Sequence, residues 1–226
     1  DATIRGESER YAMPVRITAD RLDRNQPNPK TLAAVRRGPR EGTLVDVATE
    51  PLFITNLLSD LRRSFSADES GYRVDFKPTA RLKTIPDEPV SNIRAVETEQ
   101  TNSTSLVDDR YVVKIYRRIE SGLNPEIEIG RFLTDIAGFA NTPALLGSIE
   151  LTGADTRSAV AIVHAFVENQ GDAWTLSSVA LDRFVEGQSL VATTDTTPAE
   201  DEKAAYQRYM MQTGKRVAEM QMALAS

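Results

Sequence analysis

Two neighbouring stretches decide the fold of this chain: Glu99-Gln100-Thr101-Asn102-Ser103-Thr104-Ser105 and Arg110-Tyr111-Val112-Val113-Lys114-Ile115-Tyr116. The first is polar and predicts a loop, whereas the second is apolar and predicts a β-strand with one lysine in its middle. Because successive side chains of a strand point to opposite faces, Lys114 shares its face with Val112 and Tyr116. An ammonium group there must reach water or an anion, since burying an unpaired charge is costly.

A helix is predicted shortly after this lysine strand, over residues 124–137. Asn124 is a favoured N-cap residue, and Pro125 suits the first helical position. In kinase-like N-lobes, a strand lysine reaches the nucleotide phosphates and pairs with a glutamate of the next helix. This order favours a nucleotide-binding role for Lys114, although a lone strand lysine is more often a solvated edge residue.

The composition excludes several classes of protein. Of the 226 residues, 40% are hydrophobic, and the formal net charge of -6 argues against general binding of nucleic acid or of anionic membranes. Disulfides and thiolate metal sites are excluded because the chain has no cysteine. No apolar run approaches the roughly 20 residues of a membrane-spanning helix, and no signal peptide is present, so we expect no membrane partner and a cytoplasmic location.

Residues 1–90 predict an α+β cap at the N-terminus. Strands are expected over Tyr11–Thr18, Thr31–Arg37, Thr43–Val47 and Tyr72–Thr79. A helix that begins at Pro51 places Phe53, Leu57 and Leu61 on one face. These elements together predict a curved antiparallel sheet packed against one long helix.

Residues 91–167 predict a kinase-like N-lobe, and residues 168–226 predict a hinge followed by helices. The order in the N-lobe is strand, polar loop, lysine strand, helix, strand, hairpin and strand, and its last strand is expected over Ser158–Val167. After the hinge, Asp172 can cap a helix that runs through Phe184, and a final amphipathic helix follows the polar segment that ends at Pro198.

Several motifs, in this order, resemble those of bacterial maltokinases. They are the stretches 99–105, 113–118 and 124–134, then Asn141-Thr142-Pro143, Leu145-Leu146-Gly147, 166–167 and 169–174, and the N-terminal part is similar too, at 11–14 and 35–38. The resemblance covers nearly the whole chain. Members of this family occur alone or fused behind a trehalose synthase (maltose glucosyltransferase) domain, and a chain that begins at Asp1 without an initiator methionine suits the fused form.

The resemblance implies ATP- and Mg²⁺-dependent phosphorylation of maltose to maltose 1-phosphate, within trehalose and glycogen (α-glucan) metabolism. It also implies a two-lobed kinase of the aminoglycoside phosphotransferase type, preceded by a cap of cystatin-like topology. In this scheme Lys114 contacts the α- and β-phosphates. Glu128 is preferred over Glu126 as its partner because it lies within the Glu-Ile-Gly-Arg-Phe-Leu signature, although helical periodicity alone does not decide.

The same resemblance assigns further nucleotide contacts. Backbone N–H groups and hydroxyls would cover the phosphates in place of the glycines of protein kinases, from Thr101, Asn102, Ser103, Thr104 and Ser105. Main-chain groups of Ala165, Phe166 and Val167 would hold the adenine edge. His164-Ala165 departs from the Gln-Glu-like pair expected there, which puts a side-chain role at this hinge in doubt.

The parts that perform catalysis are missing from these residues. The sole histidine, His164, is followed by Ala165 and Phe166, so it cannot belong to the H-x-D catalytic loop. Because phosphoryl transfer needs a group that orients the attacking hydroxyl and a carboxylate that holds Mg²⁺, both are expected beyond Ser226. No catalytic or metal-binding residue is therefore predicted here, and the chain alone is expected to be inactive.

Two other functions stay open. Residues 1–90 carry no catalytic constellation, so the chain could serve chiefly as a structural or regulatory module that docks the kinase to a synthase domain or to another subunit. Alternatively, the protein could be a kinase-like phosphotransferase with another acceptor, because the missing lobe selects the acceptor.

Overall fold

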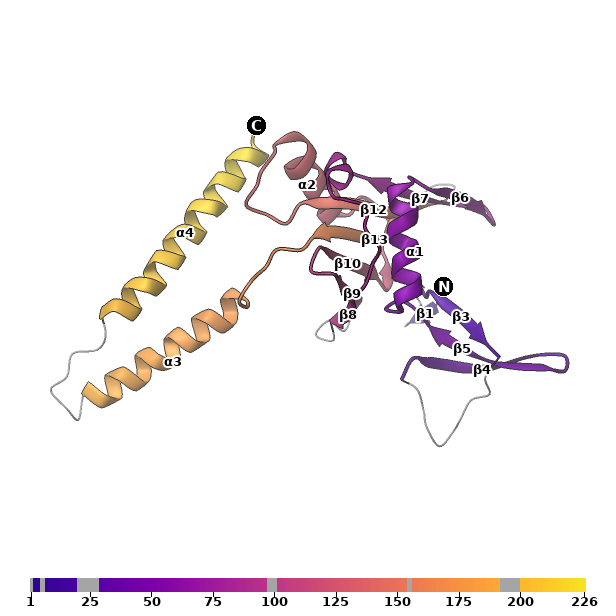
Figure 1. Cartoon of the computed structure of the whole chain (residues 1–226), viewed down its shortest axis with the longest axis horizontal. Coiled ribbons are helices and arrows are strands. Elements are labelled where there is room, and N and C mark those ends of the chain that lie inside the picture. The colour runs from indigo at the N-terminus through magenta and orange to yellow at the C-terminus, as the bar shows by residue number, and fades with distance from the viewer. Residues whose placement is uncertain (1, 5–6, 20–28, 97–100, 154–155, 192–199) are drawn as a thin grey trace. The chain divides into compact units, whose positions relative to one another are not determined.

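The computed structural model describes residues 2–4, 7–19, 29–96, 101–153, 156–191 and 200–226 (Figure 1). The described residues form a mixed α/β fold with four α-helices and several sheets. They divide into two compact units, Asp1–Phe166 and Val167–Ser226, and each is described by itself.

Seven strands of the first unit form the main sheet, in the order β6-β7-β12-β13-β10-β9-β8, and every neighbouring pair is antiparallel. Their bounds are Ser66–Glu69 (β6), Tyr72–Pro78 (β7), Ile93–Val96 (β8), Asn102–Val107 (β9), Tyr111–Tyr116 (β10), Leu145–Thr152 (β12) and Arg157–Ala165 (β13). The predicted lysine strand is confirmed as β10, and it lies inside the sheet between β9 and β13.

The polar stretch predicted as a loop is instead mostly strand. Thr101 is a bend, but Asn102–Ser105 belong to β9 and pair with β10, so that Thr104 lies opposite Lys114. Strand pairing satisfies the backbone groups that a loop would leave to water. The tight turn of this hairpin lies further on, at Asp108 and Asp109, whose φ angles are both 50°. Glu99 and Gln100 lie outside the described residues.

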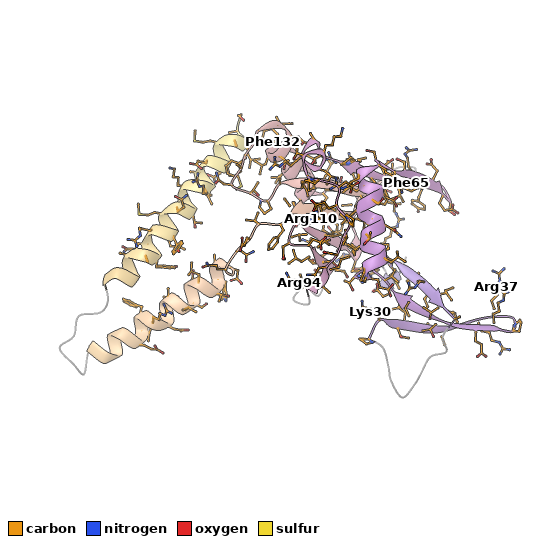
Figure 2. All side chains as sticks on the ribbon, viewed as in Figure 1. Lys30, Arg37, Phe65, Arg94, Arg110 and Phe132 are labelled. Atoms are coloured by element: carbon orange, nitrogen blue, oxygen red, sulfur yellow. The ribbon has the colours of Figure 1, made fainter. Side chains whose placement is uncertain are left out.

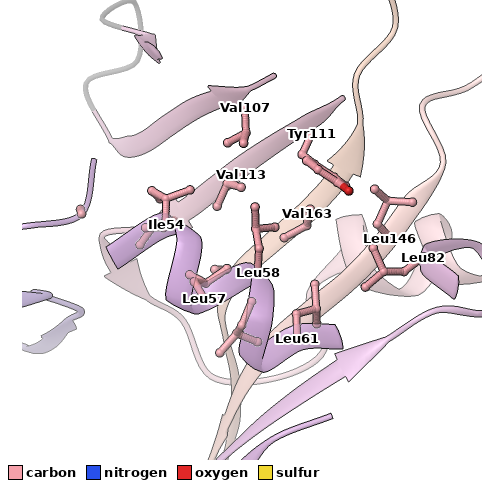
Figure 3. Close-up of a cluster of buried hydrophobic side chains, with 14 residues drawn as sticks. Ile54, Leu57, Leu58, Leu61, Leu82, Val107, Tyr111, Val113, Leu146 and Val163 are labelled. Atoms are coloured by element: carbon pink, nitrogen blue, oxygen red, sulfur yellow. The ribbon is translucent and has the colours of Figure 1, made fainter. Parts of the chain in front are cut away.

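Helix α1 (Pro51–Arg62) packs against one face of the main sheet and builds the core (Figure 3). The apolar face predicted for this helix is confirmed, because Leu57 and Leu61 are buried. The core cluster consists of Ala48, Ile54, Leu57, Leu58, Leu61, Leu82, Val107, Tyr111, Val113, Ile115, Leu146, Ile149, Ala161 and Val163. Thus β6 and β7, which lie within the predicted cap of residues 1–90, belong to the same sheet as the lysine strand, and α1 contributes to the same core.

The remaining strands form two small sheets. One contains β1 (Ala2–Ile4), β2 (Glu7–Tyr11) and β11 (Arg118–Ile119), and the other contains β3 (Val15–Thr18), β5 (Arg40–Asp46) and β4 (Thr31–Arg37). The strand predicted over residues 11–18 is therefore split between two sheets, and Pro14, which has no backbone N–H, lies in the break. Figure 2 shows Arg37 projecting near the turn of the β4–β5 hairpin. The N-terminal residues thus contribute to three sheets, not to one curved sheet.

The Arg117 side chain ties the β3-β5-β4 sheet to the main sheet. The Arg117 guanidinium donates to Ser103 Oγ at 2.8 Å and to Asp46 Oδ2 at 2.6 Å, and so joins β9 to the end of β5. A short 3₁₀ helix, η1 (Ala80–Thr84), follows β7 and buries Leu82 in the core.

The second unit contains helices α3 (Ala173–Val191) and α4 (Glu200–Leu224). The cap predicted at Asp172 is confirmed, because its Oδ1 accepts a hydrogen bond from the Thr175 N–H at 2.7 Å. Helix α3 continues past Phe184, where it was expected to end. Residues 192–199 of the predicted polar segment lie outside the described residues.

Within the described ranges, each helix is too short or too polar to cross a membrane.

Candidate functional site

The Lys114 side chain lies on the face of the main sheet opposite to the one that α1 covers. Its neighbours in register are Thr104 on β9 and Ile162 on β13. The alternation predicted for β10 is present, since Tyr111, Val113 and Ile115 are buried in the core while Val112, Lys114 and Tyr116 are only partly buried. The sequence therefore places this lysine correctly on the strand and on its outer face.

Helix α2 (Pro125–Arg131) packs beside Lys114, and a π-helical turn, η2 (Phe132–Ile136), continues it. The predicted N-cap is confirmed, because Asn124 Oδ1 accepts from the Glu126 N–H at 2.9 Å. Ile127 on α2 contacts a small apolar cluster that contains Leu145 and Ile162. A Cβ atom at Gly130 would lie 3.2 Å from Leu145 Cβ, so glycine allows the helix to approach β12 closely.

Lys114 and Glu126 form an ion pair that joins β10 to the first turn of α2. The distance from Lys114 Nζ to Glu126 Oε1 is 2.9 Å, and the two side chains are 21% and 48% exposed. The Tyr116 hydroxyl donates to the other carboxylate oxygen, Glu126 Oε2. Burial raises the pKa of the Glu126 carboxyl, but the hydrogen bonds from Tyr116 and Lys114 outweigh it and hold this pKa below its ordinary value.

The choice of Glu128 as the partner of Lys114 was wrong. Consecutive residues of an α-helix are rotated by about 100°, so Glu126 and Glu128 diverge on either side of the buried Ile127. Glu126 points to β10, whereas Glu128 lines a cavity of about 110 Å³ together with Arg131 and Arg157. Helical periodicity in the sequence does not distinguish Glu126 from Glu128. Only the packing of α2 against the sheet shows which of them faces Lys114.

Tyr116 is the site residue that the sequence reasoning missed. Its ring centroid lies 5.4 Å from Lys114 Nζ, and its hydroxyl bonds to Glu126. The signal was available, because a two-residue spacing on a strand puts both side chains on one face.

The five predicted phosphate-contacting residues do not share one face. Thr104 and Asn102 lie opposite Lys114 and Tyr116, on the outer face. Ser105 lies on the core side, where it is 1% exposed, so its hydroxyl cannot contact a bound nucleotide. Ser103 also lies on the core side and accepts the hydrogen bond from Arg117 described above. These residues lie on two faces because they belong to a strand, in which successive side chains point to opposite sides of the sheet. In a loop, neighbouring side chains could have pointed to the same ligand.

The predicted adenine-binding segment, Ala165 to Val167, has part of its backbone already bonded. The Ala165 N–H donates to Ala144 O and the Phe166 N–H to Arg110 O, each at 2.9 Å. These two N–H groups are therefore occupied within the first unit. Val167 belongs to the second unit, and its carbonyl accepts from the Asn169 side chain at 3.0 Å.

His164 lies near the ion pair, opposite Val112 on β10. Burial lowers the pKa of its imidazole, while the Glu126 charge raises it and the Lys114 charge lowers it. The lowered pKa favours the neutral form of the ring.

Among the residues that the structure describes, no three histidine, aspartate or glutamate side chains gather closely enough to hold a metal ion. The Mg²⁺ ligands expected beyond Ser226 stay a prediction.

No family model matches the chain. Among solved structures it is similar to a glucosamine kinase in complex with glucosamine, ADP and inorganic phosphate, with a TM-score of 0.54 and 18% identity over 95% of this chain and 48% of that chain. A second glucosamine kinase structure (crystal form A) gives the same TM-score and identity, with 46% of that chain covered. The chain thus spans about half the length of these kinases, and this similarity shows a shared fold.

Proposed function

We propose that this chain binds the phosphates of ATP within a sugar kinase, through Lys114 positioned by Glu126. One observation carries the proposal: the ion pair lies on the sheet face that α1 leaves uncovered, in a chain whose fold is that of half a sugar kinase. The fold alone would not name a function, but a strand lysine paired with a helix glutamate is the arrangement that kinases use for phosphate contact.

The donors at this site fit a phosphate ligand. A lysine ammonium has three N–H donors, and within the described residues Lys114 donates one hydrogen bond, to Glu126. Its side chain is 21% exposed, so water or a ligand oxygen can reach it. When bound, Mg-ATP would supply the phosphoryl group, and the chain's own part is to hold and neutralise the phosphates. The remaining candidates from the predicted loop are the exposed Thr101 and the partly exposed Asn102, whereas Thr104 on the outer face is only 7% exposed.

We place the catalytic base and the Mg²⁺ ligands outside these residues, and therefore expect activity from the full-length protein only. Maltose is the acceptor that the sequence motifs favour, with maltose 1-phosphate as the product, and a fused trehalose synthase domain is the proposed partner. Glucosamine is the competing acceptor, because a similar structure contains it. A docking role for the N-terminal residues would be an additional function and would not exclude nucleotide binding.

Lys114→Met should lower kcat/KM for ATP by about a hundredfold in the full-length protein, because a cation that contacts the transferring phosphates stabilises their charge in the transition state. The measurement is ATP-dependent phosphorylation of maltose and of glucosamine. Lys83→Met, at an exposed position of η1, is the matched control and should retain full activity. Undiminished activity of Lys114→Met would reject the assignment, and phosphorylation of glucosamine but not of maltose would reject the acceptor.

A further inference from the structure

Tyr116 contacts both members of the ion pair. It ends strand β10, two residues after Lys114 and on the same face. The Lys114 ammonium lies over its ring, 5.4 Å from the centroid, and its hydroxyl donates to Glu126 Oε2. Because Lys114 takes the other oxygen, Oε1, each oxygen of the carboxylate has its own donor.

We propose that Tyr116 is a positioning residue, which holds Glu126 and Lys114 in the geometry that receives a phosphate group. The phosphate part of this proposal rests on the proposed function, whereas the effect of Tyr116 on Glu126 does not.

An ion pair of this kind needs such support. Glu126 is about half exposed, and an exposed pair between flexible side chains contributes little by itself, because solvent screens it and both side chains lose rotamer freedom. The Tyr116 ring, by contrast, packs against the apolar cluster that contains Ile127 and Ile162. A packed ring with few rotatable bonds fixes its hydroxyl in space, and through it the carboxylate.

The Tyr116 hydrogen bond would hold Glu126 in place while a phosphate binds to Lys114. When the Lys114 ammonium turns part of its donor capacity to a phosphate, Glu126 keeps the hydrogen bond from Tyr116 and the N-cap keeps its backbone in place. The Glu126 carboxylate can then still accept a hydrogen bond from Lys114 while the ammonium contacts the phosphate. Without the Tyr116 hydroxyl, the Glu126 carboxylate would lose one of its two donors and could rotate into water. The Lys114 ammonium would then have no fixed partner to hold its position.

The test is Tyr116→Phe, which removes the hydroxyl and retains the ring over Lys114. Tyr111→Phe is the matched control: Tyr111 lies at the other end of β10, faces the core, and its hydroxyl accepts from Arg62 Nη2 at 2.7 Å. Both variants lose one tyrosine hydroxyl from the same strand. Urea unfolding of each protein verifies that the compared proteins are folded under the assay conditions.

Two readouts are measured in the full-length protein. Carbon-13 NMR titration of the Glu126 carboxyl should show its pKa moved upward in Tyr116→Phe and unchanged in Tyr111→Phe. Calorimetry should show Mg-ADP binding weakened roughly tenfold in Tyr116→Phe, the lower end of the effect of one lost hydrogen bond to a charged group. A merely structural role would change stability but not the Glu126 titration.

The outcomes separate the two claims. An unchanged Glu126 titration in Tyr116→Phe overturns the positioning role, whatever the nucleotide affinity. A shifted titration with undiminished Mg-ADP affinity overturns its link to phosphate binding. If the unsubstituted protein binds no Mg-ADP, the proposed function fails, and the Glu126 titration still decides whether Tyr116 holds the pair.

Discussion

Leu61→Ala should lower the free energy of unfolding of the first unit by about 4 kcal/mol, the upper part of the range for a leucine removed from a rigid core. Leu61 is fully buried on the last turn of α1. It lies so close to β12 that a Cβ atom added at Gly147 would be 2.7 Å from Leu61 Cδ1. Truncation therefore leaves a cavity between helix and sheet, and the paired strands of the sheet cannot move in to fill it.

Leu52→Ala is the matched control, because Leu52 lies on the same helix and is 62% exposed. It should cost less than about 0.5 kcal/mol. Urea unfolding is best followed by far-UV circular dichroism or by amide hydrogen exchange of β12 and β13, since the only tryptophan, Trp174, belongs to the second unit. Equal costs for the two variants would show that α1 is not part of the sheet's core.

Glu150→Gln should destabilise the protein by about 3 kcal/mol at pH 7. Glu150 on β12 is 1% exposed, and its carboxylate accepts from Lys77 Nζ at 3.0 Å, from Ser148 Oγ at 2.8 Å and from Arg157 Nε. Burial raises the pKa of the Glu150 carboxyl, but these hydrogen bonds outweigh it and lower the pKa to about 2. A neutral amide leaves two cations without their partner. Because Lys77 and Arg157 are 36% and 46% exposed, water offsets part of the loss.

The same residue predicts a pH dependence. The folded-state pKa of Glu150 lies below the ordinary glutamate value of 4.5, so its stabilisation is fully present above pH 4.5 and is lost as the pH falls toward 2. The difference in unfolding free energy between the original protein and Glu150→Gln should therefore be largest at neutral pH and shrink below pH 4.5. Urea unfolding at pH 7, 4.5 and 3 measures it. A difference that stays constant over this range would show that the Glu150 charge is not held by its neighbours.

Local signals in the sequence predicted the parts of the site that depend on one element. The period of β10 placed Lys114 on the outer face, and Asn124 with Pro125 marked the start of α2. Each of these is fixed by the backbone geometry of a single strand or helix.

Features that depend on long-range packing were not predictable in this way. The membership of β7 in the main sheet rests on its pairing with β12, in which Phe76 lies opposite Ile149, and no local pattern contains that pairing. The choice between Glu126 and Glu128 depends on how α2 packs against the sheet. The polar composition of residues 101–105 suggested a loop, because β9 has few of the large apolar residues that usually reveal a strand.

The contact between Lys114 and nucleotide phosphates is tested most directly by NMR of ¹³C-methylated lysines in the full-length protein during titration with Mg-ADP and, separately, with AMP. Calorimetry on the same samples verifies that each nucleotide binds. We predict that the Lys114 resonance moves strongly with Mg-ADP and far less with AMP, which lacks the β-phosphate, while the Lys83 resonance moves with neither. A Lys114 resonance that stays in place while Mg-ADP saturates the protein would contradict the account.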